Sequence, residues 1–241
     1  MKTLAEPTFE NIEQLKTIKN DLKRFMMGYK FAIDEVNTKL NILKEEFQYI
    51  HEYNPIEHIS SRVKTPESIL KKLKRKNCEL SLDSIKENIK DIAGIRITCS
   101  FISDVYKVSE MIKNQKDITV IECKDYIKNA KPNGYQSLHL IIKIPVFMTD
   151  RVEHTYVEIQ IRTIAMDFWA SLEHKIYYKF NKEIPERLTT ELKEAAMSAM
   201  ELDKKMERLH EEVKMIKSTE NSTEHLMDYS INEKLSLLIN S

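Results

Sequence analysis

The sequence of 241 residues contains few glycines, at positions Gly28, Gly94 and Gly134 only. A GxGxxG turn or a P-loop needs glycines a few residues apart, because the backbone must approach the phosphates closely. The wide spacing of these three glycines excludes both motifs. If the protein binds nucleotide phosphates, it must therefore hold them with side chains.

Cysteines and long apolar runs are also scarce. Cys78, Cys99 and Cys123 are an odd number and have no CxxC spacing, which argues against a disulfide framework or a zinc site. No apolar run approaches the length of a membrane-spanning helix or a signal peptide. The absence of HExxH and GxSxG excludes the common zinc hydrolases and α/β-hydrolases. We therefore expect a reduced, cytoplasmic protein.

The chain carries no net charge, with 38 Lys and Arg residues against 38 Asp and Glu residues. No field of the whole chain attracts nucleic acid or a membrane surface, so an anion site must come from local clustering. Apolar residues make up 41% of the sequence, which is enough for a substantial core. The length fits one large domain, or one domain with helical appendages.

Helical periodicity dominates the N-terminal part of the chain. Residues 11–51 contain no proline and carry apolar side chains in steps of three and four, which predicts an amphipathic helix with Gly28 as a candidate position for a break. Thr65 and Pro66 are typical of an N-cap and a first helical residue, and they predict a second helix to about Lys76. A shorter helical stretch is expected before the first strand.

The C-terminal part returns to helical spacing. From residue 192 to 216, apolar residues follow steps of three and four, which is typical of a coiled-coil-like seam. Its members are Leu192, Ala195, Ala199, Leu202, Met206, Leu209, Val213 and Ile216. The polar segment 218–225 is expected to be a linker before a short helix.

The middle of the chain alternates β-type runs with one helix. Strands are predicted at 94–101, 118–127, 137–147 and 154–163, with a helix at about 104–113. Four strands and few helices predict a mixed sheet of the α+β or α/β class. The chain then divides into four regions: an N-terminal helical region (1–55), a core (56–180), a C-terminal helix (181–217) and a polar tail (218–241).

Three of the predicted strands alternate apolar and polar residues. If they are neighbours with matching faces, their polar side chains gather on one surface of one sheet. These side chains are Arg96, His139, Lys143, Glu158, Gln160 and Arg162. A solvated outer face is normal for an antiparallel sheet and explains the same pattern, and the residues alone favour it.

The segment 61–76 carries seven cations against the single acid Glu67. They are Arg62, Lys64, Lys71, Lys72, Lys74, Arg75 and Lys76. On a helix from Thr65, Ser68 shares one face with two of them, Lys72 and Arg75, and Lys64 precedes the first turn. Such a strip, with the N–H groups of the helix N-terminus, can bind phosphates without glycines. A solvated basic face, or an RNA-binding regulatory module on residues 62–76, fits the spacing equally well.

A turn and two carboxylates complete the candidates. In KPNGYQSLH, Pro132, Asn133 and Gly134 fit a type I turn that would leave Tyr135 at the head of a strand, where a tyrosine can stack on a base. A half-buried tyrosine is the commoner reason for such a position. Asp91 stands before the first predicted strand and Glu158 lies within the last. If the two meet, they can hold Mg²⁺ against a triphosphate, which depends on the strand order.

Four segments, in this order and with these gaps, closely resemble the synthetase domain of RelA/SpoT-type (p)ppGpp synthetases. They are RVKTPESILKKLKRK (62–76), DIAGIRITCSF (91–101), KPNGYQSLHL (131–140) and VEIQIRTIAMDFWASLEHKIYYK (157–179). The short chain resembles the small alarmone synthetase branch, and DFWASLEHKIYYK is most similar to its RelP-like subgroup. The resemblance covers about residues 22 to 216.

The resemblance implies transfer of the β,γ-pyrophosphate of ATP to the ribose 3′-hydroxyl of GDP or GTP, with release of AMP. It also implies an α+β (α/β-type) fold with a nucleotidyltransferase-like mixed β-sheet flanked by helices, and N- and C-terminal helical extensions. Mg²⁺ as cofactor and a homotetramer are further implications.

Roles for individual residues follow from the matching motif positions. Arg62 and Arg96 would sandwich the adenine of ATP. Its phosphates would be held by Lys64, Ser68, Lys72 and Arg75. Asp91 and Glu158 would bind Mg²⁺, with Glu158 also placed to take the proton of the 3′-hydroxyl. The acceptor site would consist of Tyr135, stacked on guanine, with Lys124, Lys131, His139, Gln160 and Asp167. Lys124 and Asp167 depart from the arginine and asparagine of many relatives, which leaves the choice between GDP and GTP open.

Overall fold

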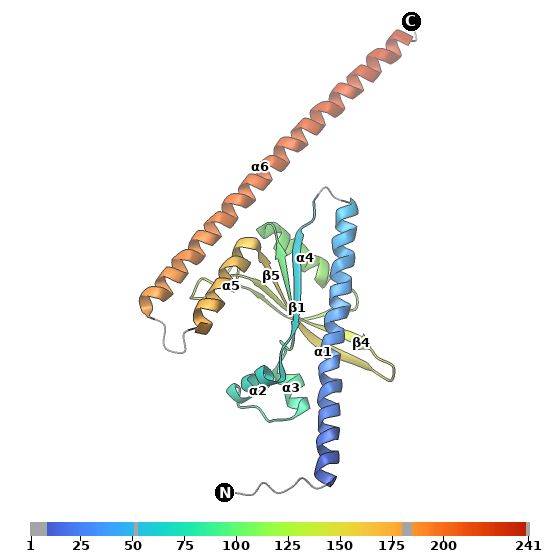
Figure 1. Cartoon of the computed structure of the whole chain (residues 1–241). Coiled ribbons are helices and arrows are strands. Elements are labelled where there is room, and N and C mark those ends of the chain that lie inside the picture. The colour runs from blue at the N-terminus through green and yellow to red at the C-terminus, as the bar shows by residue number, and fades with distance from the viewer. Residues whose placement is uncertain (1–8, 51–52, 180–184, 240–241) are drawn as a thin grey trace.

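The computed structural model describes the backbone of residues 9–50, 53–179 and 185–239, and the side chains within 16–50, 53–176 and 185–217 (Figure 1). Five strands form one mixed sheet in the order β1-β2-β5-β4-β3. They are β1 (Ile56–Val63), β2 (Ala93–Cys99), β3 (Thr119–Asp125), β4 (Leu138–Phe147) and β5 (Val152–Thr163). β2 and β5 run parallel, and the other neighbouring strands are antiparallel. The predicted mixed sheet of an α+β protein is confirmed.

Six helices surround the sheet in the described part of the chain. They are α1 (Phe9–Ile50), α2 (Pro66–Arg75), α3 (Leu82–Asn88), α4 (Ile102–Lys113), α5 (Ile164–Lys179) and α6 (Glu186–Ile239). Thr65 is the N-cap of α2, and its hydroxyl accepts a hydrogen bond from the Ser68 N–H, as the sequence predicts. None of these helices is both long enough and apolar enough to cross a membrane.

The sequence analysis missed strand β1. This strand lies at one edge of the sheet, pairs with β2 alone, and is exposed over most of its length. Its apolar residues Ile56, Ile59 and Val63 do not alternate, and the register shifts between Ile56 and His58. Period-two patterning requires one face to be buried evenly, which an irregular edge strand does not need.

Two helix predictions are also wrong. Helix α1 continues through Gly28 without a break, and the glycine leaves room for a neighbour, since a Cβ at this position would lie 2.9 Å from Oε2 of Glu153. The segment 218–225, expected as a linker, is part of α6. It contains neither proline nor glycine, so nothing in its backbone chemistry stops a helix.

The apolar face of the sheet forms the main core. Alternate residues of β2, β4 and β5 pack there with one side of α1 and of α4, and all of these side chains are buried in a single cluster. Representative members are Ala32, Ile97, Val108, Leu140 and Ile159. Because this face is covered, the opposite face of the sheet is the one that can meet a substrate.

Helix α6 docks against the other end of the core through polar contacts. Oδ2 of the buried Asp203 accepts a hydrogen bond of 2.6 Å from the Thr163 hydroxyl at the end of β5. The Glu207 carboxylate accepts hydrogen bonds from the backbone N–H groups of Ile102 and Ser103. These are the first residues of α4, whose N-cap Phe101 provides no side-chain acceptor, so a residue of α6 caps α4 in its place.

The predicted seam of α6 does not face this core. The side of α6 that docks carries Ala196 and Asp203, both buried. Seam residues from the middle of the helix onward are about half exposed, at 54% for Leu202, 46% for Leu209 and 52% for Val213. The seam is therefore an apolar stripe without an intramolecular partner along most of its described length.

Candidate active site

The strand register brings the polar residues of the sheet together. Gly94 of β2 pairs with Glu158 of β5, and Arg96 pairs with Gln160. On the other side of β5, His139 of β4 also pairs with Gln160. Directly paired residues place their side chains on the same face. The predicted gathering of polar side chains on one surface is therefore confirmed.

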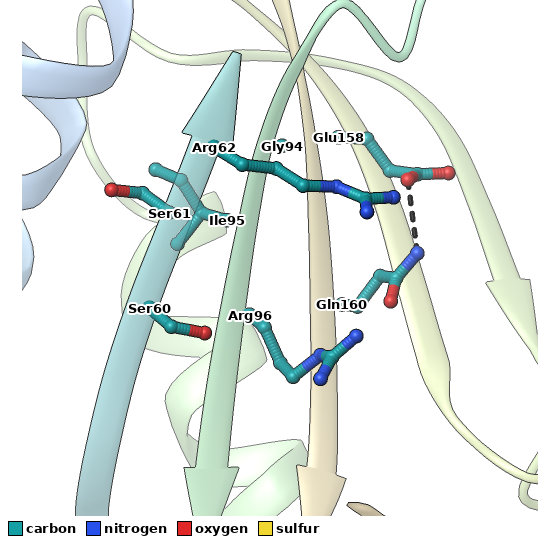
Figure 2. Close-up of a pocket in the computed structure, with 8 residues that line it drawn as sticks. All are labelled: Ser60, Ser61, Arg62, Gly94, Ile95, Arg96, Glu158 and Gln160. Atoms are coloured by element: carbon teal, nitrogen blue, oxygen red, sulfur yellow. Dashed lines mark hydrogen bonds between the residues drawn. The ribbon is translucent and has the colours of Figure 1, made fainter. Parts of the chain in front are cut away.

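A cavity of about 220 Å³ opens on this surface (Figure 2). It is lined by Ser60, Ser61, Arg62, Gly94, Ile95, Arg96, Glu158 and Gln160. Figure 2 shows Arg62 reaching from β1 across Gly94 toward Glu158, while Arg96 reaches toward Gln160 farther along the strands. A Cβ at residue 94 would lie 3.9 Å from Cγ of Arg62, so the Arg62 side chain passes directly over the glycine. The cavity thus joins two cations to one carboxylate.

Asp91 lies just before β2 and is held by two lysines. Lys64 and Lys72 both donate to its Oδ2, at 2.5 and 2.6 Å. Burial would raise the pKa of the Asp91 carboxyl, but the two lysines outweigh it and hold that pKa below the ordinary value. Oδ1 of Asp91 is buried and has no hydrogen-bond partner among the described residues. This oxygen is therefore a buried acceptor without a partner among the described residues, beside the two lysines.

Glu158 is partly buried and has one close partner. Its Oε2 accepts a hydrogen bond of 2.9 Å from Gln160, and its Oε1 lies 3.8 Å from Nδ1 of His139. Within the described residues, no group of three or more His, Cys, Asp and Glu side chains could hold a metal ion. The oxygens of Glu158 and Asp91 nevertheless suit Mg²⁺, which is commonly bound by one or two carboxylates together with substrate phosphates and water. The donor set therefore fits a magnesium ion whose other ligands are phosphate oxygens and water.

The turn before β4 places Tyr135 beside this surface. The Gly134 N–H donates to the Lys131 carbonyl at 2.8 Å, as the predicted type I turn requires. The Lys131 ammonium lies 4.7 Å from the centre of the Tyr135 ring. The Tyr135 hydroxyl lies 2.7 Å from Nε2 of His139. Burial, reinforced by nearby cations, lowers the pKa of His139 to about 3, so this imidazole is neutral near pH 7.

Arg162 lies at the centre of these contacts. It is buried, with 3% of its surface exposed, so the solvated-face explanation fails for this residue. Its Nη2 donates to the Tyr135 hydroxyl at 2.6 Å and to Gln160 Oε1 at 2.7 Å. Its Nη1 donates at 3.1 Å to Oδ1 of Asp167, which also pairs with Arg96 at 3.2 Å. Sequence patterning placed Arg162 on this face but assigned it no role, because burial of a polar side chain is not visible in an alternating pattern.

Four of the predicted site residues line the cavity, namely Arg62, Arg96, Glu158 and Gln160, and the others do not. Ser68 and Arg75 are exposed on α2, with Ser68 held in the N-cap of its own helix. Lys124 is half exposed on β3, where it pairs with Glu122 at 3.0 Å and lies in register with His139. Of the predicted phosphate-binding strip, Lys64 and Lys72 contact Asp91, at the edge of the polar face.

Comparison with known proteins gives consistent matches. A family profile described as "Region found in RelA / SpoT proteins" matches residues 61–183. The GTP pyrophosphokinase YwaC of Bacillus subtilis is 56% identical over 203 residues, which are 84% of this chain and 97% of the relative.

Solved structures agree. The small alarmone synthetase 2 of Bacillus subtilis superimposes with a TM-score of 0.73 at 55% identity, covering 80% of this chain and 99% of the other. The small alarmone synthetase 1 of the same organism, bound to its product pppGpp, gives 0.74 at 39% identity, with 80% and 98% covered.

Proposed function

This chain belongs to the RelA/SpoT family of GTP pyrophosphokinases, and we propose that it is a small alarmone synthetase acting through the cavity between β1, β2 and β5. It transfers the β,γ-pyrophosphate of ATP to the 3′-hydroxyl of GDP or GTP and releases AMP. The observation that carries the proposal is the gathering of Arg62, Arg96, Glu158 and Gln160, from three strands, around one cavity.

ATP binds on the β1 and α2 side of this cavity. Arg62 and Arg96 come from neighbouring strands and line the same space, which supports their placement on the two faces of the adenine. Lys64 and Lys72 converge on one oxygen of Asp91, so their ammonium groups stand close together and can share the triphosphate. Ser68 and Arg75 extend the same helix face outward and are assigned to the phosphates by their motif positions.

The guanosine nucleotide binds on the β4 and β5 side. The Tyr135 ring is held beside Gln160 through Arg162, which supports stacking of Tyr135 on guanine. Four further residues are assigned to the acceptor site by their motif positions. These are Lys124, Lys131, His139 and Asp167, of which Lys124 and Lys131 provide positive charge for the phosphates.

Magnesium is the cofactor that the two carboxylates can hold. Asp91, through its unpartnered Oδ1, and Glu158 are the residues that would bind it. When bound, Mg²⁺ supplies positive charge that neutralises the triphosphate.

The reaction as proposed needs no covalent intermediate with the protein. The 3′-oxygen of the acceptor attacks the β-phosphorus, the bond from that phosphorus to the α–β bridging oxygen breaks, and AMP leaves with this oxygen. Glu158 accepts the proton of the 3′-hydroxyl. The arginines and lysines hold the two nucleotides in line and stabilise the charge that moves onto the leaving group.

A product assay tests this function. The full-length protein is incubated with γ-labelled ATP and Mg²⁺, with GMP, GDP or GTP as acceptor. We expect the label on a guanosine 3′-diphosphate, equal amounts of AMP, and turnover with GDP and GTP in preference to GMP. Label that stays on ATP, or appears only as free phosphate, would exclude the proposal.

RNA binding by residues 62–76 finds no support in these contacts. Lys64 and Lys72 turn toward Asp91 and the sheet, and a carboxylate beside a basic face repels a phosphate backbone.

We also propose a homotetramer in the cytoplasm. Apolar residues on the outer sides of α5 and α6 support self-association, because an exposed apolar surface of this extent marks an interface. They include Phe168, Leu172 and Ile176 on α5, and Leu202, Met206, Leu209, Val213 and Ile216 on α6. ATP and guanosine nucleotides are metabolites of the cytoplasm, which is where the enzyme would meet them.

A further inference from the structure

Arg162 has no role in the reaction as written, yet it makes more polar contacts than any other described residue of the polar face. We propose that Arg162 is a positioning residue, which orients the two groups that flank Glu158 so that both present an N–H to its carboxylate. This inference rests on the proposed function of Glu158 and adds the contacts that fix the orientation of its carboxylate.

The first group is the amide of Gln160. A guanidinium carries only donors, so the atom of Gln160 that lies 2.7 Å from Nη2 of Arg162 must be the oxygen Oε1. The amide nitrogen then faces the other way, 2.9 Å from Oε2 of Glu158. A flipped amide would place two sets of N–H groups against each other at Arg162, and two acceptors against each other at Glu158. Arg162 therefore decides which end of Gln160 reaches Glu158.

The second group is the imidazole of His139. Nη2 of Arg162 donates to the Tyr135 hydroxyl at 2.6 Å, so this oxygen accepts and its own hydrogen must go elsewhere. The partner in reach is Nε2 of His139, at 2.7 Å. In the proposed arrangement this hydrogen goes to Nε2, which then accepts and carries no proton, so that the proton of the neutral ring lies on Nδ1. Nδ1 is the nitrogen nearest to Glu158, at 3.8 Å from Oε1.

Both chains end at the same carboxylate. One runs from Arg162 through Gln160 to Oε2, and the other runs through Tyr135 and His139 to Oε1. The second ends in a gap longer than a hydrogen bond, so in the free enzyme His139 acts on Glu158 through its N–H dipole. With an N–H on each side, the carboxylate cannot turn without losing a favourable contact, which keeps it aimed at the cavity.

The burial of Arg162 explains why this position needs arginine. Its side chain is 4% exposed and pairs with Asp167, a carboxylate that it shares with Arg96. A lysine would keep the charge, but its single ammonium cannot match the planar fork that meets Tyr135, Gln160 and Asp167 together. The substitution Arg162→Lys therefore removes orientation while it keeps the charge.

Histidine NMR tests the tautomer without any activity measurement. The full-length, nucleotide-free protein is labelled with ¹⁵N-histidine, and the His139 signals are identified by their loss in His139→Gln. We expect the Nδ1–H tautomer in the wild type and a mixture of tautomers in Tyr135→Phe, which lacks the hydroxyl. An Nε2–H tautomer in the wild type, or an unchanged tautomer in Tyr135→Phe, would overturn the inference.

Kinetics test the consequence. Tyr135→Phe keeps the ring for stacking, so we expect the KM for the guanosine nucleotide to stay within about twofold while kcat falls roughly tenfold. Arg162→Lys should lower kcat by roughly 10- to 100-fold, with little change in the KM for ATP. Because both chains start at Arg162 and Tyr135 belongs to one of them, the double variant should be no slower than Arg162→Lys alone. Losses that multiply in the double variant would contradict a shared chain.

Arg151→Lys, the same exchange at an arginine that pairs with Asp150 and Glu153 next to β5, is the matched control and should turn over normally. If Arg162 served the fold alone, Arg162→Lys would lower the melting temperature and leave kcat per folded molecule unchanged. Should Arg162→Lys not fold, Tyr135→Phe and the NMR measurement still decide. A wild type without pyrophosphate transfer would refute the proposed function. The His139 tautomer would still test the contacts from Arg162 through Tyr135 to His139.

Discussion

At the scale of single residues, the charges of the site are paired so that a substrate can replace a partner. Oδ2 of Asp91 holds both Lys64 and Lys72, while its Oδ1 has no partner in the described structure. A triphosphate arriving at the two lysines would compete with a carboxylate for them, and a cation arriving with the triphosphate would take up that carboxylate. Two ammonium groups against one carboxylate leave this point of the free enzyme positively charged, which suits the binding of an anion.

The first prediction concerns Glu158. Glu158→Gln preserves the shape of the side chain but removes its negative charge and its ability to accept a proton. We expect kcat to fall by roughly 10²- to 10⁴-fold, the range that loss of a general base causes, while the protein stays folded and still binds ATP. Calorimetry with a non-reacting ATP analogue measures the binding. Glu153→Gln, the same change on the same strand away from the cavity, serves as control. Near-normal turnover of Glu158→Gln would remove this residue from the mechanism.

At the scale of elements, α6 supports the turn that carries Tyr135. Gly134 of that turn has φ +88°, a conformation that other residues rarely adopt, and a Cβ there would lie 2.4 Å from Cβ of Ala196. On the neighbouring helix α5, Nε1 of Trp169 donates to the backbone carbonyl of Leu192 in α6 at 2.9 Å. The position of the acceptor tyrosine therefore depends on a helix more than fifty residues downstream.

The second prediction follows from this contact. Gly134→Ala combines backbone strain of about 1–2 kcal/mol with overpacking against Ala196 of about 1–3 kcal/mol. We expect reduced stability and a raised KM for the guanosine nucleotide, measured by denaturant unfolding and steady-state kinetics. In an Ala196→Gly background the same substitution should cost less, by the overpacking part alone. An equal cost in both backgrounds would show that α6 does not press on the turn. Gly94→Ala is the control in the unfolding experiment, because a Cβ at residue 94 would make only ordinary van der Waals contacts.

The third prediction concerns the polar contact between α6 and β5. Burial raises the pKa of Asp203, the Thr163 hydroxyl opposes this rise, and Glu207 adds to it. Because the folded protein binds the proton more tightly than the unfolded chain, ionisation of Asp203 costs stability as the pH rises above its ordinary pKa of 3.8.

Asp203→Asn can still accept from Thr163 and does not ionise. We expect its melting temperature to exceed that of the wild type by about 2–4 °C at pH 7, the shift that roughly 1 kcal/mol produces in a chain of this size. The gain should shrink as the pH falls toward 4. Glu201→Gln, at an exposed position of the same helix, should change nothing. A variant less stable than the wild type at pH 7 would contradict the sign.

At the scale of the whole molecule, the apolar stripe of α6 is the feature that the folded chain leaves uncovered. In Figure 1, α6 extends well beyond the sheet, with α5 beside its first turns. The side chains that face the core are offset by one position from the predicted seam, so the seam points outward. One side of α6 is already buried against its own chain. A second copy of the chain that covers the apolar stripe would bury the other side as well.

The fourth prediction tests this arrangement. Leu209→Glu combined with Val213→Glu places two charges in the stripe and should dissociate the oligomer into monomers of 28.4 kDa, as measured by light scattering after size exclusion. Lys205→Glu, an exposed change outside the stripe, should leave the assembly intact. A wild type that already runs as a monomer would refute the homotetramer.

The sequence by itself determined most of the secondary structure and the choice of face. Alternation in residues 155–163 placed Glu158, Gln160 and Arg162 together because a strand turns every second side chain to the same side. The N-cap at Thr65 and the turn before Tyr135 were equally local, since each depends on the chemistry of a few adjacent residues. The resemblance to synthetases added roles that spacing alone left open.

The tertiary structure alone decided which of these residues meet. The strand order puts β2 beside β5, and so brings Arg96 to Gln160 across some sixty residues of sequence. It also made β1 a strand, because an edge strand takes its partner from the sheet and not from its own pattern. Above all it buried Arg162: an alternating pattern tells which side a residue faces, but only packing from other elements tells whether water or other side chains cover it.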